Sequence, residues 1–335
     1  MIFSLLTSLK NELTETPLVL YGYDSMIDIL LSTYNGARFV REFIASLGRQ
    51  TCREFRLLVR DDGSDDATMD AVQRAVADFH IPDAVFLSSS GRHLGVVQSF
   101  GELLAQSSGR YVMFADQDDV WHEDKVSVML KAMRGAEEQY GEDVPLLVFS
   151  DLRVCDEACF PLADSFLRWQ SFPRRSGTLV SLMVQNNVTG CATMINRALK
   201  GRLRLPFPNE AIWHDWYLAM FAAAIGRIVF VDRALVDYRI HGGNCNGARP
   251  YGFGSWFRWL RCGRKELNRR IVMTQRQASA FLRQYGDMLG TADLETLGAW
   301  AEIGKHPKFK RIVTCRKYGF RKNTLARNVG MWWAI

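Results

Sequence analysis

Short apolar runs alternate with helical patterns along the first 150 residues, and this alternation constrains the fold more than any other feature. Each run has the length of a buried strand, and each intervening segment has the length and periodicity of a helix. The predicted strands are 27–32, 55–60, 85–87, 111–115 and 146–150, and the predicted helices are 38–49, 67–79, 95–107 and 121–139. Elements at this spacing form βαβ units, so the sequence predicts an α/β protein with a mostly parallel sheet covered by helices on both faces.

The alternation ends after Asp151. We predict a strand-like stretch over 182–195, a helix over 212–225 and a strand over 227–231, followed by aromatic, basic and helical patterns. The expected organisation is an N-terminal extension over 1–25, an α/β domain over 26–245 and a basic, aromatic-rich helical region over 246–335.

The composition is that of a folded protein with a large core. Of the 335 residues, 48% are hydrophobic and 23% are charged, which suits one large domain or two smaller ones. The seven cysteines are odd in number, scattered and without a CxxC pair, which argues against a disulfide framework or a zinc site and favours a reducing cytosol. The apolar start is interrupted at Lys10, and the apolar run 217–226 is about half of the roughly 20 residues of a membrane span, so we expect neither a signal peptide nor a membrane-spanning helix.

The charge is unevenly distributed along the chain. Residues 246–335 contain 18 Lys and Arg against 5 Asp and Glu, a net charge of +13, whereas the preceding 245 residues have a net charge of −7. Such asymmetry suggests an acidic body followed by a basic segment that meets an anionic surface. The charge pattern alone does not distinguish between nucleic acid and anionic lipid as this surface.

Three carboxylates, Asp116, Asp118 and Asp119, follow the predicted strand 111–115. In an open parallel sheet the ligand crevice lies beyond the carboxyl ends of the strands, and hard divalent cations that bridge phosphates favour oxygen ligands. These residues therefore indicate a site for a nucleoside diphosphate and a metal. An Asp-rich turn that caps the following helix is the alternative, and it stays open on this stretch alone.

A second acidic turn follows the strand 55–60. A carboxylate there can accept a hydrogen bond from a pyrimidine N–H and so select uracil or thymine. Asp62 and Asp61 are competing candidates for this contact.

Six short motifs occur in a fixed order across residues 27–245. They are STYNG from Ser32, DDGSDD from Asp61, ADQDD from Ala115, NNVTG from Asn186, HDW from His214 and YRIHG from Tyr238. Together they resemble the family 2 glycosyltransferases of the GT-A fold, and among these the bacterial rhamnosyltransferases most. The resemblance implies a GT-A, Rossmann-like nucleotide-diphospho-sugar transferase fold. It also implies transfer of a sugar from a nucleoside diphosphate to a hydroxyl, with inversion at the anomeric carbon.

The resemblance assigns roles to individual residues. Asp215 corresponds to the base that takes the proton of the acceptor hydroxyl. Asp118 is the implied direct ligand of a divalent metal, Mn²⁺ or Mg²⁺, which His241 and Asp116 would also approach. The implied nucleotide-sugar contacts are Ser32, Thr33, Tyr34, Asn35, Asp61, Asp62, His93, Asp116 and Gln117. The implied acceptor contacts are Asn187, Gly190, His214 and Trp216.

The implied donor is a dTDP- or UDP-sugar, with L-rhamnose as the sugar of the most similar group. Related rhamnosyltransferases often have asparagines where this chain has His93 and Ser99. This departure weakens the assignment of the sugar.

Family 2 enzymes of bacterial surface-polysaccharide pathways, O-antigen synthesis included, often act on lipid-linked acceptors. We therefore expect a glycan or polyprenyl-linked glycan acceptor and a cytoplasmic protein peripheral on the cytoplasmic face of the inner membrane. Basic residues near an anionic bilayer contribute about 1 kcal/mol each. The aromatics Trp256, Phe257, Trp259, Trp332 and Trp333 would insert at the interface, or alternatively pack on the catalytic domain.

The sequence offers two alternative functions. A nucleic-acid-binding protein is not expected, because the acidic body would repel phosphate backbones and no binding motif is recognisable. A catalytically silent sugar-nucleotide-binding partner of a polysaccharide assembly complex is the second alternative. The presence of Asp116, Asp118 and Asp215 argues against silence.

Overall fold

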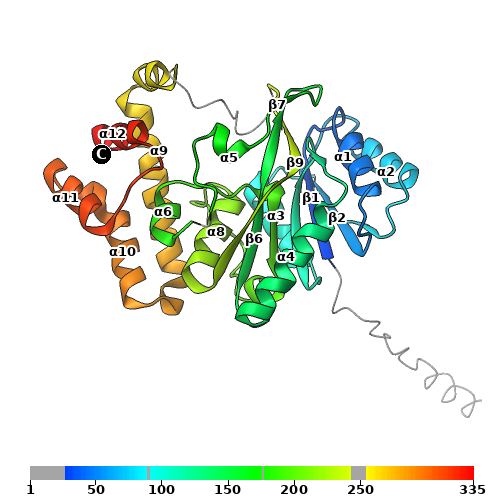
Figure 1. Cartoon of the computed structure of the whole chain (residues 1–335), viewed down its shortest axis with the longest axis horizontal. Helices are drawn as coiled ribbons and strands as arrows, with labels where there is room; N and C mark the ends of the chain where they lie inside the picture. Colours follow the sequence, from blue (N-terminus) through cyan, green and yellow to red (C-terminus); the bar gives the residue numbers. More distant parts are fainter. Residues whose placement is uncertain (1–26, 89–90, 176, 243–253) are drawn as a thin grey trace, which may run out of the picture.

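The structure is a computed structural model that describes residues 27–335 apart from 89–90, 176 and 243–253, with the backbone alone over 254–262. The predicted extension over 1–25 and the side chains of Trp256, Phe257 and Trp259 lie outside the described residues. Figure 1 shows a central sheet flanked by helices, with the C-terminal helices gathered at one end.

A nine-stranded sheet forms the centre of the molecule, in the order β3-β2-β1-β4-β8-β6-β9-β5 with β7 paired to β6. The strands are β1 (Ile27–Thr33), β2 (Phe55–Asp61), β3 (Ala84–Phe86), β4 (Tyr111–Asp116), β5 (Val120–Trp121), β6 (Leu146–Cys155), β7 (Pro161–Ala163), β8 (Thr193–Asn196) and β9 (Arg227–Arg239). Strands β3, β2, β1 and β4 run parallel, as do β6 and β9, whereas β8 is antiparallel to both of its neighbours. The predicted α/β architecture is confirmed.

Helices cover both faces of this sheet because its strands are apolar on both faces. Successive side chains of a strand point to opposite sides, so Ile29 and Leu31 pack in one core cluster and Leu30 in the other, all three fully buried. The helices of the first domain are α1 (Val40–Gly48), α2 (Thr68–Asp78), α3 (Val96–Gln106), α4 (Lys125–Tyr140), α5 (Phe166–Trp169), α6 (Leu179–Val184), α7 (Arg197–Gly201) and α8 (His214–Ile225). Side chains of α1, α2 and α4 join the core of Ile29, and those of α3, α6 and α8 join the core of Leu30.

One buried carboxylate fastens the edge of the sheet at which β1 begins. Asp28 is fully buried and accepts two hydrogen bonds of 2.9 Å from the Arg56 guanidinium. It also accepts hydrogen bonds from the Ser107 hydroxyl and from the backbone N–H groups of Ser108 and Gly109. Because a buried charge is tolerated only when it is paired and hydrogen-bonded, this network ties β1 and β2 to the loop before β4.

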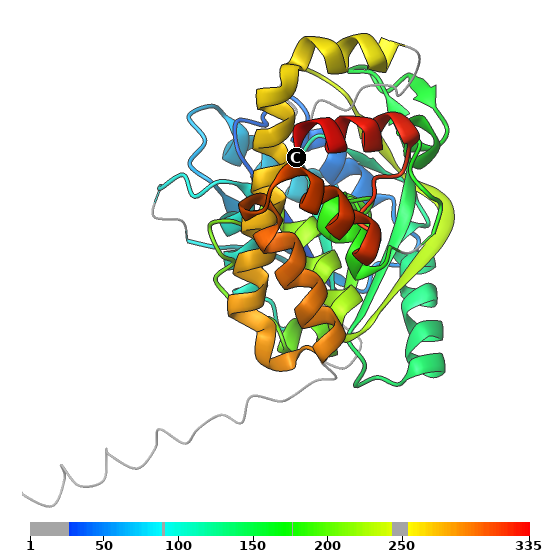
Figure 2. The same cartoon turned by 90° about the vertical axis from the view of Figure 1, so that its left-hand side faces the viewer.

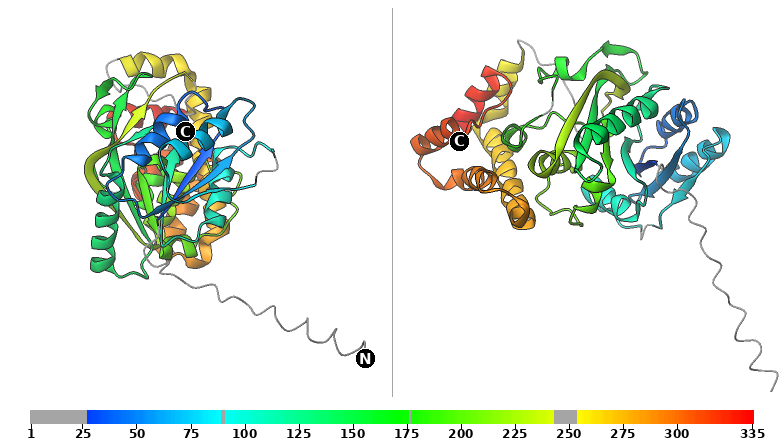
Figure 3. Two further views of the ribbon diagram at one scale, coloured as in Figure 1. Left: turned by 90° about the vertical axis from the view of Figure 1, so that its right-hand side faces the viewer. Right: turned by 60° about the horizontal axis from the view of Figure 1, so that its bottom comes forward.

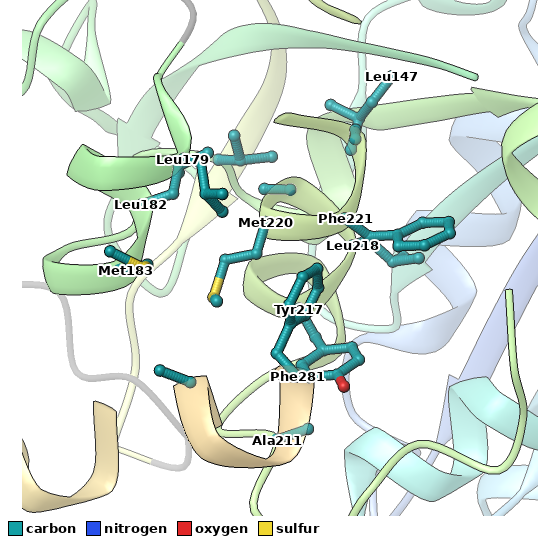
Figure 4. Packing of buried hydrophobic residues seen from close by; sticks show 14 of the residues in the cluster. Leu147, Leu179, Leu182, Met183, Ala211, Tyr217, Leu218, Met220, Phe221 and Phe281 are labelled. Carbon is teal, nitrogen blue, oxygen red and sulfur yellow. The ribbon is translucent and has the colours of Figure 1, made fainter. Parts of the chain in front are cut away.

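The C-terminal region forms a helical layer against one end of the α/β domain (Figures 2 and 3). It consists of α9 (Gly254–Tyr285), α10 (Thr291–Glu302), α11 (Lys308–Tyr318) and α12 (Leu325–Ala334). The ring of Phe281 packs edge-on against Tyr217 of α8, with centroids 5.4 Å apart (Figure 4). Trp300 of α10 is also fully buried. Across the described helices, none combines the length and the hydropathy needed to cross a membrane.

The strands predicted over 146–150 and 227–231 are longer in the structure, because β6 ends at Cys155 and β9 at Arg239. Two other predicted elements differ in where they begin or in kind. The helix predicted over 121–139 begins only at Lys125, because Trp121 belongs to β5 and donates its backbone N–H to the Ser46 hydroxyl at 3.1 Å. Most of the strand-like stretch 182–195 is not a strand. Thr178 and Ser181 form a capping box that starts α6, and within the stretch only 193–195 belong to a strand, β8, because a short apolar run fits a buried helix as well as a strand.

Candidate active site

The predicted site residues meet at the carboxyl edge of β1, β2 and β4. The parallel register sets Ser32 opposite Asp116 and Thr33 opposite Asp61. Since the carboxyl ends of adjacent parallel strands lie at one edge, three polar strand ends come together there. The order of strands and carboxylates in the sequence predicts this arrangement of the three strand ends.

The loop after β4 brings Asp118 next to His241, which follows β9. The Asp118 Oδ2 atom and the His241 Nε2 atom are 2.8 Å apart, and the two side chains are 17% and 13% exposed. Arg239 holds the loop by donating from its Nε to the Asp118 carbonyl oxygen at 2.8 Å. The buried Arg239 guanidinium also donates to the carbonyl oxygen of Glu157 and to the carboxylate of Glu42, so it is a structural clamp in this arrangement.

Asp116 and Asp119 form a second, deeper cluster with Cys191. Their ligand atoms all lie within 4.8 Å of one another. Asp119 accepts a 3.2 Å hydrogen bond from the backbone N–H of Arg239, and α4 begins without a side-chain cap. The helix-capping interpretation of Asp119 is therefore wrong.

Lys125 is the cation of this deeper cluster. It is fully buried, its Nζ lies 3.2 Å from the centroid of the Trp121 ring, and it donates to the Cys191 carbonyl oxygen. Burial lowers the pKa of Lys125 to about 7. Burial, and then the charges of Asp118 and Asp215, raise the pKa of Asp116 to about 7.

The two acidic groups differ in their fitness for a metal. Burial raises the pKa of the Cys191 thiol well above its usual value, so that side chain is protonated and is a poor ligand for Mn²⁺ or Mg²⁺. Lys125 already supplies the cation of the deeper cluster. Asp118 and His241 offer a carboxylate oxygen and an imidazole nitrogen at one point, with partial exposure. This pair fits a divalent ion better than the deeper cluster does.

Asp62 and Asp61 are both held by groups of the protein. Asp62 is 2% exposed and accepts hydrogen bonds from Arg60 at 2.6 Å and from the backbone N–H groups of Leu94 and Gly95 at 2.8 Å. Asp61 accepts from the hydroxyls of Thr33 and Ser64. A base that bound here would share these acceptors, and Asp62 ties the loop before α3 to the end of β2.

The Ser32 hydroxyl belongs to the same network. It lies 2.7 Å from the Ser99 hydroxyl, which also accepts from Arg60 at 2.8 Å. Ser99 is thus a buried link between α3 and the strand ends, and an asparagine there would disturb this link.

Tyr34 and His93 form an exposed aromatic pair at the rim. Their ring centroids are 4.4 Å apart, and the Tyr34 residue is 46% exposed. The Gln117 amide bonds both backbone polar groups of Tyr34, at 3.0 and 2.9 Å. A Cβ atom on Gly36 would lie 2.1 Å from the Gln117 Oε1 atom, so only glycine leaves room for this contact. Asn35 joins the rim to the acidic turn by accepting from the Asp65 backbone N–H at 2.9 Å.

Asp215 stands in the first turn of α8. Its carboxylate accepts from the backbone N–H of Gly190 at 2.9 Å and from the Asn186 amide at 3.3 Å. Burial raises the pKa of Asp215 to about 7, although the N–H groups of Gly190 and Trp216 favour its charged form. A carboxyl group with a pKa near 7 is suited to accept a proton at neutral pH.

Among the residues predicted to contact an acceptor, Gly190 donates its backbone N–H to Asp215, and His214 and Trp216 flank Asp215 in the chain. His214 is 5% exposed, and its ring stacks on Phe100 with centroids 4.0 Å apart. The Asn187 amide donates to the Arg175 carbonyl oxygen at 3.1 Å, and the Trp216 indole donates to the Leu182 carbonyl oxygen. These side chains are thus engaged with other parts of the protein, and their contact with an acceptor stays a prediction.

Sequence reasoning missed Lys125, Arg60 and the thiol of Cys191. Lys125 could have been found, because it lies in a helical stripe that otherwise reads Val126, Met129 and Met133. A lysine among such positions must meet a buried acid. Arg60 pairs with Asp62 two residues along the chain, but its bond to Ser99 and the approach of Cys191 to Asp116 and Asp119 join distant segments and carry no comparable signal.

The fold is the GT-A fold of nucleotide-sugar glycosyltransferases. Two solved structures show the fold. The Pyrobaculum calidifontis mannosyltransferase PcManGT in complex with GDP-Man and Mn²⁺ superposes with a TM-score of 0.53 at 16% identity, covering 93% of this chain and 85% of that one. S. aureus TarS 1–349 in complex with UDP-GlcNAc gives 0.52 at 15% identity, covering 92% and 89%.

One family model matches the first part of the described chain. Residues 28–140 match the model of the family described as Glycosyl transferase family 2. This stretch, about a third of the chain, is therefore similar to a family 2 glycosyltransferase domain, and relatives that match the chain are named as glycosyltransferases.

Several proteins named as glycosyltransferases are similar to part of this chain. An uncharacterized glycosyltransferase of Nostoc is 26% identical over 227 residues, covering 65% of this chain and 66% of the relative. The dTDP-rhamnosyl transferase RfbG of Shigella flexneri is 22% identical over 229 residues, covering 65% and 74%. An Escherichia coli UDP-Glc:α-D-GlcNAc-diphosphoundecaprenol β-1,3-glucosyltransferase is 28% identical over 110 residues, covering 33% and 42%. The matched segment thus spans only part of each relative.

Proposed function

We propose that this glycosyltransferase uses a divalent metal and a dTDP- or UDP-sugar, and transfers the sugar with inversion to a hydroxyl of a lipid-linked glycan. The relatives support the two substrate classes, since one is named for dTDP-rhamnose and another for a diphosphoundecaprenol acceptor. L-Rhamnose is the first donor sugar that we propose. The place of action is the cytoplasmic face of the inner membrane, in bacterial surface-polysaccharide synthesis.

One observation carries this proposal. The Asp116 carboxyl interacts with the charges of both Asp118 and Asp215. Asp118, which pairs with His241, and the candidate base Asp215 therefore both lie near Asp116 and belong to one site. A leaving group bound beside Asp118 and an acceptor bound beside Asp215 would face the same anomeric carbon.

The chemistry follows from these positions. Asp118 and His241 would hold the metal, which supplies positive charge to the diphosphate as the bond from its oxygen to the anomeric carbon breaks. The acceptor oxygen forms the new bond to that carbon from the opposite side. Its proton passes to the Asp215 carboxylate, which Gly190 and Asn186 hold in place.

The base of the donor would be recognised between Asp62 and the rim. Asp62 and Asp61 supply acceptor oxygens for a pyrimidine N–H, and Tyr34 and His93 supply aromatic surface. The Gln117 amide, next to Asp116 in the chain, holds the Tyr34 backbone in place through two hydrogen bonds. This arrangement supports a pyrimidine nucleotide.

Release of nucleoside diphosphate from a panel of sugar nucleotides tests the proposal. The wild type is compared, with Mn²⁺ or Mg²⁺ and a lipid-linked glycan extract, to Asp118→Asn and Asp215→Asn. Asp65→Asn is the matched control, because Asp65 is an exposed acid of the neighbouring turn. We expect dTDP or UDP release by the wild type and the control, and a loss of about 100-fold or more in Asp215→Asn.

Two results would contradict it. Unchanged release in both site variants would show that the roles are wrongly assigned. Binding of sugar nucleotides without any turnover would favour the silent partner of an assembly complex.

A further inference from the structure

The end of the chain is uniformly basic. Residues 303–335 contain nine Lys and Arg and no Asp or Glu. Five of the nine lie in α11, namely Lys308, Lys310, Arg311, Arg316 and Lys317. A charge of this sign, concentrated on one helix, attracts an anionic surface.

This helix has one face toward the protein and one toward solvent. Cys315 is 3% exposed and packs in the core formed with α9 and α10. The guanidinium of Arg311 turns back to the start of the helix and donates to the Gly304 carbonyl oxygen at 2.7 Å. The side of α11 that faces the protein is therefore occupied by the packing of Cys315 and by the hydrogen bond of Arg311.

The outward side combines apolar and cationic residues. Phe309 is 80% exposed and Val313 is 47% exposed, and at a spacing of four residues they lie on the same side of the helix. Lys310, Arg316 and Lys317 are exposed within three or four positions of Val313. We call these five residues the α11 outer face.

The position of α11 leaves this face accessible. Figures 1 and 2 show α11 at the end of the molecule remote from α1 and α2, on the outside of the helical layer. A phenylalanine with four fifths of its surface in water contributes nothing to the core, so the fold gives no reason for its exposure. The cations that flank Phe309 indicate that its exposed ring belongs to a surface that meets an anionic partner.

An anionic bilayer matches both properties of the α11 outer face. Phospholipid headgroups attract Lys and Arg, and the boundary below them accepts apolar side chains of a helix lying in the plane of the membrane. A nucleic acid would use the cations alone and would leave Phe309 and Val313 in water. The apolar pair therefore decides between these two anionic surfaces.

We propose that the α11 outer face docks this enzyme on anionic phospholipid. The inference deepens the proposed function and rests on it in one respect, since docking would bring the site to a lipid-linked acceptor. Docking itself requires no metal, donor or catalytic carboxylate. Its failure can therefore be told apart from failure of the proposed reaction.

The experiment is co-sedimentation of the full chain with phosphatidylglycerol-containing vesicles and with pure phosphatidylcholine vesicles, at low and high salt. One variant combines Phe309→Ala with Val313→Ala, and a second combines Lys310→Ala with Lys317→Ala. The matched controls are Phe160→Ala, which removes a 69% exposed phenylalanine elsewhere, and Lys131→Ala with Arg134→Ala, which removes two exposed cations of α4. Nucleoside-diphosphate release and circular dichroism are measured on every variant.

We expect the wild type to bind anionic vesicles in a salt-sensitive way and to bind phosphatidylcholine weakly. Removal of the two lysines should lower the partition constant about fivefold per charge, and removal of the apolar pair should lower it about tenfold. Both controls should bind like the wild type, and nucleoside-diphosphate release from the donor alone, measured without membranes or a lipid-linked acceptor, should be unchanged throughout.

Three results would overturn the proposal. The first is no binding of the wild type to anionic vesicles at low salt. The second is equal binding by the Phe309→Ala/Val313→Ala variant and the wild type. The third is retention by soluble polyphosphate with no vesicle binding, which would show that the face binds polyanions and not a membrane.

Discussion

His214 should make the stability of this protein depend on pH in a calculable way. Its ring is 5% exposed, both ring nitrogens lie buried without a hydrogen-bond partner, and burial lowers its pKa to about 3. In the unfolded chain the pKa returns to about 6.5. Below that value the unfolded chain takes up a proton that the folded protein refuses, so stability is lost as the pH falls.

The size of this loss follows from the two pKa values. Each pH unit between them costs about 1.4 kcal/mol once the unfolded histidine is fully charged, so about 2 kcal/mol is lost from about pH 7.5 to about pH 5. Other groups also titrate in this range. Asp215, for example, has a pKa raised to about 7 and changes stability in the opposite direction.

The assay isolates His214 by difference. Urea unfolding is measured across this pH range for the wild type, for His214→Phe and for His306→Gln as a control with a partly exposed ring. Phenylalanine keeps the stacking on Phe100 and removes the two buried nitrogens, so it should be neutral or stabilising at the upper pH. The wild type should lose about 2 kcal/mol relative to His214→Phe by about pH 5, and little relative to the control. A difference from His214→Phe that stays constant with pH would refute the reasoning.

Three further predictions concern the sheet, the rim and the metal. Asp28→Ala leaves Arg56 without its buried partner and should cost about 3–5 kcal/mol in urea unfolding, whereas Asp78→Ala, which breaks an exposed pair, should cost under about 1 kcal/mol. Gly36→Ala displaces the flexible Gln117 amide from Tyr34, so the KM for the donor should rise several-fold with little change in stability. The control Gly135→Ala, on the open surface of α4, should leave this KM unchanged. An unchanged KM in Gly36→Ala would contradict the role of Gln117. Removal of divalent ions with EDTA should abolish nucleoside-diphosphate release, and Mn²⁺ should restore it in the wild type but not in Asp118→Asn; full activity in EDTA would rule out the metal.

The parallel half of the sheet could be predicted because its information is local. Ile29, Leu30 and Leu31 are continuously apolar and buried on both faces, which is typical of a strand between two helical layers. The strand-end carboxylates could be found for the same reason, since Asp61 and Asp116 are the last residues of such strands.

The second half of the domain could not be read in this way. A run of apolar residues near Leu182 fits a helix or a strand, and only the capping box at Thr178 decides for α6. The 2.8 Å approach of His241 to Asp118 joins residues 123 positions apart, and the burial of Lys125 beside Cys191 joins residues 66 apart. Such pairs depend on the packing of the whole domain, which no single stretch encodes.

The most direct test of the central claim is nucleotide binding with and without Mn²⁺. Calorimetry with UDP and dTDP is compared between the wild type, Asp118→Asn and Asp215→Asn. Asp118 and His241 are claimed to hold the metal, and Asp215 to act only on the acceptor. Mn²⁺ should therefore tighten binding of one of these nucleotides in the wild type and equally in Asp215→Asn, and should have no effect in Asp118→Asn. An undiminished effect of Mn²⁺ in Asp118→Asn would contradict the account.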